Sequence, residues 1–182
     1  RLSAGPMTDR FERAIANLIN ADALDPGRIH AVKETQLAEW LRPSGYFNIK
    51  ARRLRNFCHW YVEAGEYRKL KRRETGALRQ ALLAVNGIGP ETADDILLYA
   101  FGRPVFVIDA YTRRLFARLG LIAGDEGYET LRHAFEHALG PDAALFNEYH
   151  ALIVAQAKEV CRVRPRCGEC VLRKRCPGRG DS

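Results

Sequence analysis

The chain has 182 residues, of which 47% are hydrophobic and 28% are charged, and this length is enough to bury a sizeable core. It carries 29 lysines and arginines against 22 acidic residues, giving a formal net charge of +7 at pH 7. The sequence shows no signal peptide and no apolar run approaching the roughly 18 residues of a membrane span. These features predict a globular cytoplasmic protein that does not enter a membrane. The excess of positive charge favours a polyanionic partner.

The spacing of apolar residues is helical along almost the whole chain, so we predict an all-α fold. Each expected helix carries an apolar stripe with a period of about 3.6 residues. The stripes are Phe11, Ile15, Leu18 and Ile19; Ile49, Leu54, Phe57 and Tyr61; Tyr128, Leu131, Phe135 and Ala138; and Leu145, Tyr149 and Leu152. Proline and glycine separate the helices, as at Pro43 and Gly45. Only residues 104–109 resemble a strand, and that segment is short.

Basic residues gather in three groups, at 50–55, 68–73 and 162–175. Grouped positive charge is typical of a surface that binds a polyanion such as nucleic acid. Solvated helix faces are the alternative for any one group.

Residues 78–101 contain a predicted helix-hairpin-helix. An apolar helix over 78–85 leads into the sequence Asn86-Gly87-Ile88-Gly89-Pro90, after which a second helix begins. The glycines permit a tight turn and a close approach by another backbone, and Pro90 suits the first helical position. Free N–H groups at such a helix start can bind phosphate. A plain connector with glycine caps is the alternative.

Four of the five cysteines lie in one short basic loop, with the spacing Cys161-x5-Cys167-x2-Cys170-x5-Cys176. Two disulfides in so short a loop are typical of small secreted scaffolds, so we predict a cytosolic metal site instead, with Cys58 outside it. Zinc sites usually take cysteines as two close pairs. Here one close pair is flanked by single cysteines, which favours a [4Fe–4S] cluster.

Two histidines, His133 and His137, lie four residues apart on one expected helix. They could be read as a metal-binding pair, but no third ligand accompanies them. An exposed helix face is the favoured interpretation.

The hairpin, the segment AFGRPVFVIDAYTRRLFARLG and the four-cysteine loop together resemble the endonuclease III branch of the helix-hairpin-helix DNA glycosylases. The resemblance extends from residue 1 to the last cysteine. It implies base excision repair, in which a damaged base is flipped from double-stranded DNA and its N-glycosidic bond is cut. The implied fold has two helical lobes flanking a DNA-binding cleft: a six-helix barrel over 1–112 that carries the hairpin, and a lobe over 113–182 whose loop 161–176 holds the cluster. We expect a monomer.

The resemblance also assigns roles to single residues. Asp109 matches the family's catalytic aspartate, whose carboxylate stabilises positive charge on the sugar or activates water; a plain helix N-cap is the alternative. Tyr46 is expected to fill the gap that the flipped base leaves, unless it is an ordinary surface aromatic. The full set of expected DNA contacts is Tyr46, Asn48, Lys50, Gly87, Ile88, Gly89 and Thr92.

Three positions depart from the family pattern. Members with lyase activity carry a lysine where this chain has Glu91, and a carboxylate cannot form an imine with the sugar. Gly5 stands where other members place a glutamine that helps fill the DNA gap, and because Pro6 follows we expect the helix to start or bend there. The first cysteine gap is five residues instead of six, a change that a loop absorbs easily.

The favoured function is therefore a monofunctional glycosylase for an alkylated or oxidised base. One alternative is an endonuclease III-type glycosylase and lyase for oxidised pyrimidines, with Lys50 as the nearest other amine, although Lys50 is expected to contact phosphates. The other is a catalytically feeble protein that only binds lesions. Glu91 argues against the first alternative, and Asp109 argues against the second.

Overall fold

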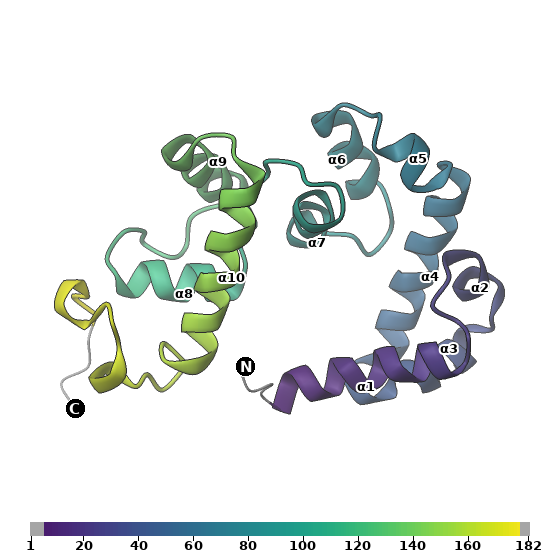
Figure 1. The fold of residues 1–182 in the computed structure, drawn as a ribbon, viewed down its shortest axis with the longest axis horizontal. Coiled ribbons are helices and arrows are strands. Elements are labelled where there is room, and N and C mark those ends of the chain that lie inside the picture. The colour runs from purple at the N-terminus through teal and green to yellow at the C-terminus, as the bar shows by residue number, and fades with distance from the viewer. Residues whose placement is uncertain (1–5, 179–182) are drawn as a thin grey trace. The chain divides into compact units, whose positions relative to one another are not determined.

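The computed structural model describes residues 6–178, and Gly5 lies outside that range. Within it the chain forms helices, turns and loops and no β-strand, which confirms the all-α prediction (Figure 1). The chain divides into two compact units, one ending at Ile88 and the other beginning at Gly89. The predicted lobes divide after residue 112 instead, and that assignment stays a prediction. Across 6–178, no helix is long and apolar enough to cross a membrane.

The first unit is built around the long helix α4. Its helices are α1 (Pro6–Asn20), α2 (Pro26–Ala31), α3 (Glu34–Leu41), the 3-10 turn η1 (Arg42–Ser44), α4 (Phe47–Glu63), α5 (Glu66–Leu70) and α6 (Thr75–Leu83). Helices α2 and α3 both pack against α4, where Leu37 and Ala51 are fully buried. On α1, Leu18 and Ala14 are buried, whereas Phe11 and the other two predicted stripe residues remain about half exposed.

The second unit surrounds a buried aromatic cluster. Its elements are α7 (Pro90–Asp95), the π-helical turn η2 (Ile96–Ala100), α8 (Ala110–Arg118), α9 (Tyr128–Leu139), α10 (Ala143–Glu159) and the 3-10 turns η3 (Cys167–Glu169) and η4 (Arg173–Arg175). Phe106 is fully buried and stacks on Phe135 with ring centroids 4.6 Å apart. Phe146 meets the edge of the same ring at 5.4 Å. Aromatic burial of this kind supplies much of a small core.

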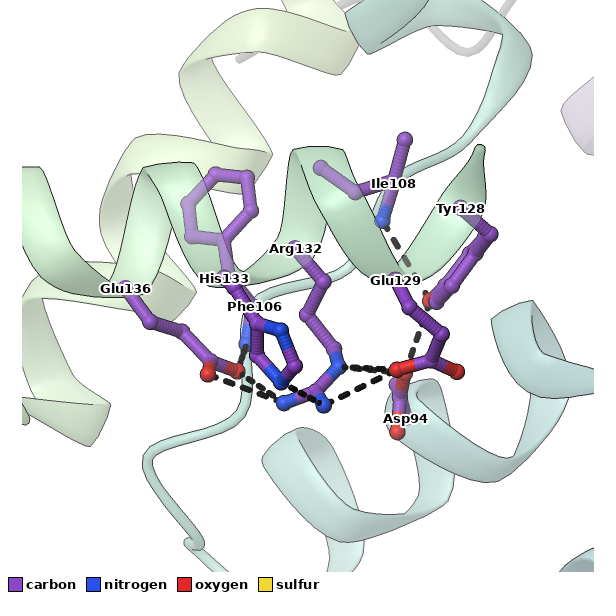
Figure 2. Close-up of polar contacts among 8 residues, drawn as sticks. All are labelled: Asp94, Phe106, Ile108, Tyr128, Glu129, Arg132, His133 and Glu136. Atoms are coloured by element: carbon purple, nitrogen blue, oxygen red, sulfur yellow. Dashed lines mark hydrogen bonds and ion pairs between the residues drawn. The ribbon is translucent and has the colours of Figure 1, made fainter. Parts of the chain in front are cut away.

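The strand expected at residues 104–109 is wrong, because the segment is extended but has no neighbouring strand. Its backbone groups bond to side chains instead. The Phe106 N–H donates to Glu136 Oε1 at 3.0 Å, and the Ile108 N–H lies 3.5 Å from the Tyr128 hydroxyl oxygen (Figure 2). Buried backbone groups need such partners. The segment therefore crosses the core and delivers Asp109 to the start of α8.

A buried ionic network fixes α7 against α9, as Figure 2 shows. Asp94 is fully buried and accepts a hydrogen bond of 2.9 Å from the Tyr128 hydroxyl. Arg132 lies 3.9 Å from Asp94 and pairs with Glu129 and Glu136 at 2.9 and 2.8 Å. A buried carboxylate with several partners holds its helix in one orientation.

The apolar stripe predicted for α10 is wrong, because a different face of the helix is buried. The buried residues are Phe146, His150, Ile153 and Ala157, whereas Leu145 and Leu152 are 42% and 57% exposed. Apolar residues occur on nearly every side of this helix, so periodicity alone could not select the face. Packing against α8 and η2 selects it, and it places a histidine in the core.

Candidate functional site

Asp109 caps the N-terminus of α8 with its side chain. Its backbone is extended, with φ −98° and ψ 178°, and its carboxylate accepts the Thr112 N–H at 2.7 Å. The side chain is 13% exposed. The N-cap interpretation of Asp109 therefore describes its backbone contact correctly, and one carboxylate oxygen remains for other chemistry.

The second carboxylate oxygen of Asp109 faces His150. His150 Nε2 lies 3.5 Å from Asp109 Oδ2, at the outer edge of hydrogen-bonding distance, so the contact is mainly electrostatic. Within residues 6–178, that nitrogen has no hydrogen-bond partner. The other ring nitrogen, Nδ1, lies 2.6 Å from the Tyr99 hydroxyl. A chain of polar groups thus leads from η2 through the core to Asp109.

The surroundings of Asp109 favour its ionised form. Burial acts most strongly and by itself would raise the pKa of this carboxyl. The interactions with His150 and with the Thr112 N–H outweigh burial, so the pKa lies below its ordinary value. A carboxylate that stays charged while largely shielded from water can stabilise a developing positive charge.

Two more carboxyl groups, Glu91 and Asp95, lie one helical turn apart on α7 and close enough to influence this group. Burial raises the pKa of Asp95 to about 6, with further contributions from Glu91, Asp109 and Asp94 against an opposing one from His150. Burial and then Asp109 raise the pKa of Glu91, although its side chain remains largely open to solvent. Closely spaced carboxyl groups with divergent pKa values are typical of sites that handle charge.

The sequence analysis missed Asp95, Tyr99 and His150. Glu91, Asp95 and Tyr99 follow one another at intervals of four residues, which is the spacing of one helix face. That spacing could have identified Asp95 and Tyr99 from the sequence. His150 gave no comparable signal, because its partners come from distant parts of the chain.

Tyr46 is held outward by an unusual backbone. Gly45 and Tyr46 both have positive φ, 68° and 48°, and the Tyr46 ring is 85% exposed directly before α4. A positive φ at an aromatic residue is uncommon and costs free energy.

Asn48 is exposed in the first turn of α4. Lys50 donates to the Ser44 carbonyl at 2.6 Å, and burial lowers its pKa.

The two glycines of the hairpin differ in their role. Gly87 has φ 97°, and a Cβ there would overlap the side chain of Arg53, so only glycine fits. Gly89 is extended at φ −95° and faces open space, and it caps α7 without a side-chain bond. Asn56 braces the turn by donating to the Asn86 carbonyl at 3.0 Å. The hairpin therefore keeps an uncovered backbone at Gly89.

All four cysteines of the C-terminal loop line one hollow. Its empty volume is about 370 Å³, including the part open to solvent. The other wall is apolar, formed by Leu115, Leu119 and Leu172. All five cysteines are free thiols. Between residues 6 and 178, no three His, Cys, Asp or Glu side chains converge closely enough to hold a single metal ion, and His133 and His137 are both exposed.

Several groups already contact the cysteine sulfurs. Arg118 Nη1 lies 3.4 Å from Cys161 Sγ, and Gln156 Nε2 lies 3.3 Å from Cys170 Sγ. The Cys176 thiol donates to the Arg118 carbonyl at 3.2 Å. Hydrogen-bond donors beside cysteine sulfurs suit thiolates that carry negative charge on a metal centre.

The structure thus places the predicted residues in three groups. The four cysteines share one hollow, and Glu91 lies near Asp109 within the second unit. Tyr46, Asn48, Lys50, Gly87 and Ile88 belong to the first unit, whereas Gly89 and the exposed Thr92 belong to the second. The DNA contacts assigned to these seven residues stay predictions.

Comparison with known proteins identifies the family. Residues 2–141 match the model of the HhH-GPD superfamily base excision DNA repair proteins. A Methanocaldococcus jannaschii protein, provisionally named as a DNA repair glycosylase, is 44% identical over 91% of this chain and 76% of its own length. Endonuclease III of Sulfolobus acidocaldarius is 29% identical over 84% of this chain and 67% of its own length.

Solved structures agree with this placement. The Helicobacter pylori 3-methyladenine DNA glycosylase bound to 1,N6-ethenoadenine has a TM-score of 0.72 and 30% identity, covering 83% of this chain and 78% of that one. An endonuclease III in a non-covalent DNA complex has a TM-score of 0.73 at 20% identity, covering 94% and 74%, and so shares the fold. The chain therefore belongs to the HhH-GPD superfamily of base excision DNA repair proteins, as an endonuclease III-like DNA glycosylase.

Proposed function

We propose that this protein is a monofunctional N-glycosylase that removes an alkylated or oxidised base from double-stranded DNA and acts as a monomer. The observation that carries the proposal is the largely shielded carboxylate of Asp109, whose pKa lies below its ordinary value, beside a position that offers Glu91 where lyases need an amine. The similarity to a 3-methyladenine DNA glycosylase, at 30% identity, supports an alkylated base.

In this proposal Asp109 acts on the sugar. The bond between C1′ and the base nitrogen breaks, its electron pair leaves with the base, and positive charge develops on the sugar. The Asp109 carboxylate stabilises that charge and accepts a proton from the water that attacks C1′. The depressed pKa of Asp109 suits both steps, because each requires the charged form.

The available amines support the expectation that lyase chemistry is absent. An imine requires a neutral amine beside C1′. Glu91 cannot supply one. Lys50 is the amine that favours the alternative glycosylase and lyase, because burial lowers its pKa. Its ammonium is, however, engaged by the Ser44 carbonyl and lies 4.7 Å from the centre of the Phe11 ring, which supports the monofunctional proposal.

DNA binding is assigned to the hairpin and to the turn before α4. The uncovered backbone at Gly89 can approach a phosphate, with Gly87, Ile88 and Thr92 beside it. Tyr46 projects from a positive-φ turn with an exposed ring, which suits insertion into the gap that a flipped base leaves. Asn48 and Lys50 follow it in the first turn of α4.

We propose further that Cys161, Cys167, Cys170 and Cys176 ligate one [4Fe–4S] cluster. The shared hollow, the free thiols and the donors near two of the sulfurs fit that group. The four thiols line one hollow, and their spacing in the sequence, one close pair flanked by single cysteines, favours a cluster over zinc. The cluster would act as a structural staple for the basic loop.

The decisive experiment offers the protein a panel of duplexes, each with a single alkylated or oxidised base. Base loss is measured separately from strand scission. The proposal predicts base loss that becomes a strand break only after alkali. Strand scission without alkali would support the glycosylase and lyase alternative. Tight binding of lesions with no base loss would support the lesion-binding alternative.

A further inference from the structure

We infer that Tyr99 and His150 form a positioning pair that keeps the Asp109 carboxylate charged and correctly oriented. By donating to one ring nitrogen of His150, Tyr99 stabilises the tautomer whose other nitrogen carries the proton and faces Asp109. The inference rests on the proposed role of Asp109 and adds two residues that act through it.

The geometry around His150 leaves one nitrogen directed at Asp109. His150 is 6% exposed and packs edge-on against Phe106 with ring centroids 6.3 Å apart. Nδ1 is engaged by the Tyr99 hydroxyl at 2.6 Å. Nε2 lies 3.5 Å from Asp109 Oδ2 and has no hydrogen-bond partner within residues 6–178. A buried polar nitrogen is costly without a partner, and Asp109 is the group it faces.

The tautomer of the imidazole follows from its two partners. A neutral imidazole has one donor and one acceptor nitrogen. The Asp109 carboxylate can only accept, so Nε2, which faces it, is the donor, and the Tyr99 hydroxyl, which can donate or accept, donates to Nδ1. Nδ1 is then the acceptor, and the proton resides on Nε2. The opposite tautomer would aim a lone pair at the Asp109 carboxylate.

Other acidic groups surround the carboxylate that the pair positions. Asp109 is faced by Glu91 and Asp95 from α7, by Tyr99 from η2 and by His150 from α10. The charge of Asp109 helps to raise the pKa of both Glu91 and Asp95, so the three carboxyl groups compete for negative charge. An N–H directed at Asp109 offsets their effect, so His150 supports the form that excision requires.

Three variants of the full-length protein test the pair. His150→Gln keeps an amide N–H near the position of Nε2, His150→Leu removes every donor, and Tyr99→Phe removes the hydroxyl that donates to Nδ1 while keeping the ring. His137→Gln is the matched control, because His137 is exposed on α9. Single-turnover excision is measured against pH, and the pKa of Asp109 is followed by 13C NMR of its carboxyl carbon.

The expected order of activity losses among the variants distinguishes a positioning role of His150 from a role in packing alone. His150→Leu should slow excision about a hundredfold at neutral pH, where Asp109 stays charged, because the orientation of its carboxylate is lost. It should also move the acidic limb of the profile, with the Asp109 pKa, upward by about one pH unit. Tyr99→Phe should lose about tenfold, and His150→Gln should remain within about threefold of wild type. An unshifted Asp109 pKa in folded His150→Leu, or equal losses in the Gln and Leu variants, would overturn the inference.

Failure of the underlying proposal gives a different pattern. If Asp109→Asn excises normally, Asp109 is not catalytic, while the NMR titration of His150→Leu still tests the pair. If Asp109→Asn is inactive and His150→Leu keeps the wild-type profile and Asp109 pKa, only the pairing is wrong.

Discussion

Replacing Asp95 by asparagine should stabilise the folded protein at neutral pH. Burial is the main reason that the pKa of Asp95 rises from 3.8 to about 6. His150 opposes that rise, and Glu91 and the other neighbouring carboxylates add to it. An amide of the same size occupies the space without carrying a charge. The substitution therefore removes an electrostatic cost that the folded state bears at pH 7.

The size and pH window of the effect follow from linkage. A rise from 3.8 to about 6 corresponds to about 3 kcal/mol, and screening at this partly exposed group reduces it to about 1–2 kcal/mol. The folded-state pKa lies above the unfolded one, so folding takes up a proton between these values. Wild-type stability therefore falls as pH rises from about 4 to about 6, and the cost stays constant above that.

Urea unfolding of the protein as purified, followed by far-UV circular dichroism between about pH 4.5 and 7.5, measures this difference. The advantage of Asp95→Asn over wild type should be smallest at the acidic end and grow to about 1–2 kcal/mol at the neutral end. Asp125→Asn, at an exposed position in the same unit, is the control and should show no such trend. Equal stability of Asp95→Asn and wild type at every pH would refute the reasoning.

Four further outcomes test the proposed site. Asp109→Asn keeps a capping oxygen but loses the charge, so excision measured in single turnovers should fall by about 100-fold or more while circular dichroism and DNA affinity stay unchanged; near wild-type excision would remove Asp109 from the chemistry. Tyr46→Ala should weaken binding to lesion duplex far more than binding to undamaged duplex, and equal losses would contradict the wedge. Borohydride should trap little covalent complex with the wild-type protein and more with Glu91→Lys; efficient wild-type trapping would favour the lyase. Iron analysis of anaerobically prepared protein should find about four irons per chain, a value that Cys167→Ser lowers and Cys58→Ser does not; stoichiometric zinc would exclude the cluster.

The helical fold could be predicted because most helices begin and end at residues whose local sequence favours those positions. Pro90 begins α7 and Asp109 caps α8 as their sequence positions indicate. The segment at 104–109 was misread because β-branched and aromatic residues suit a strand and a buried extended crossing equally well. What distinguishes the two is whether another strand lies alongside. Here Glu136 and Tyr128 meet its backbone instead.

The candidate site could be predicted only in part from the sequence, for a related reason. Asp109 was found through the motif around it, but His150 lies 41 residues further along and was assigned to no role. Its helix is apolar on nearly every side, so the stripe containing Leu145 and Leu152 looked as good as the one that is buried. Only tertiary packing brings His150 to Asp109. Pairings between distant elements are the information that a single sequence carries least directly.

Helix α8 connects the two proposed centres, and we propose that the cysteine loop holds this helix in place. Asp109 caps its first turn, and Arg118 closes its last. From there Arg118 donates to the carbonyls of Arg162 at 2.6 Å and Val163 at 3.0 Å, while Arg114 donates to the Cys161 carbonyl at 2.9 Å. A loop anchored by a cluster would hold these carbonyls in place, and α8 with them. A cap that must present one carboxylate oxygen to a sugar tolerates little movement of its helix, so a rigid loop at the far end of α8 serves the chemistry without touching it.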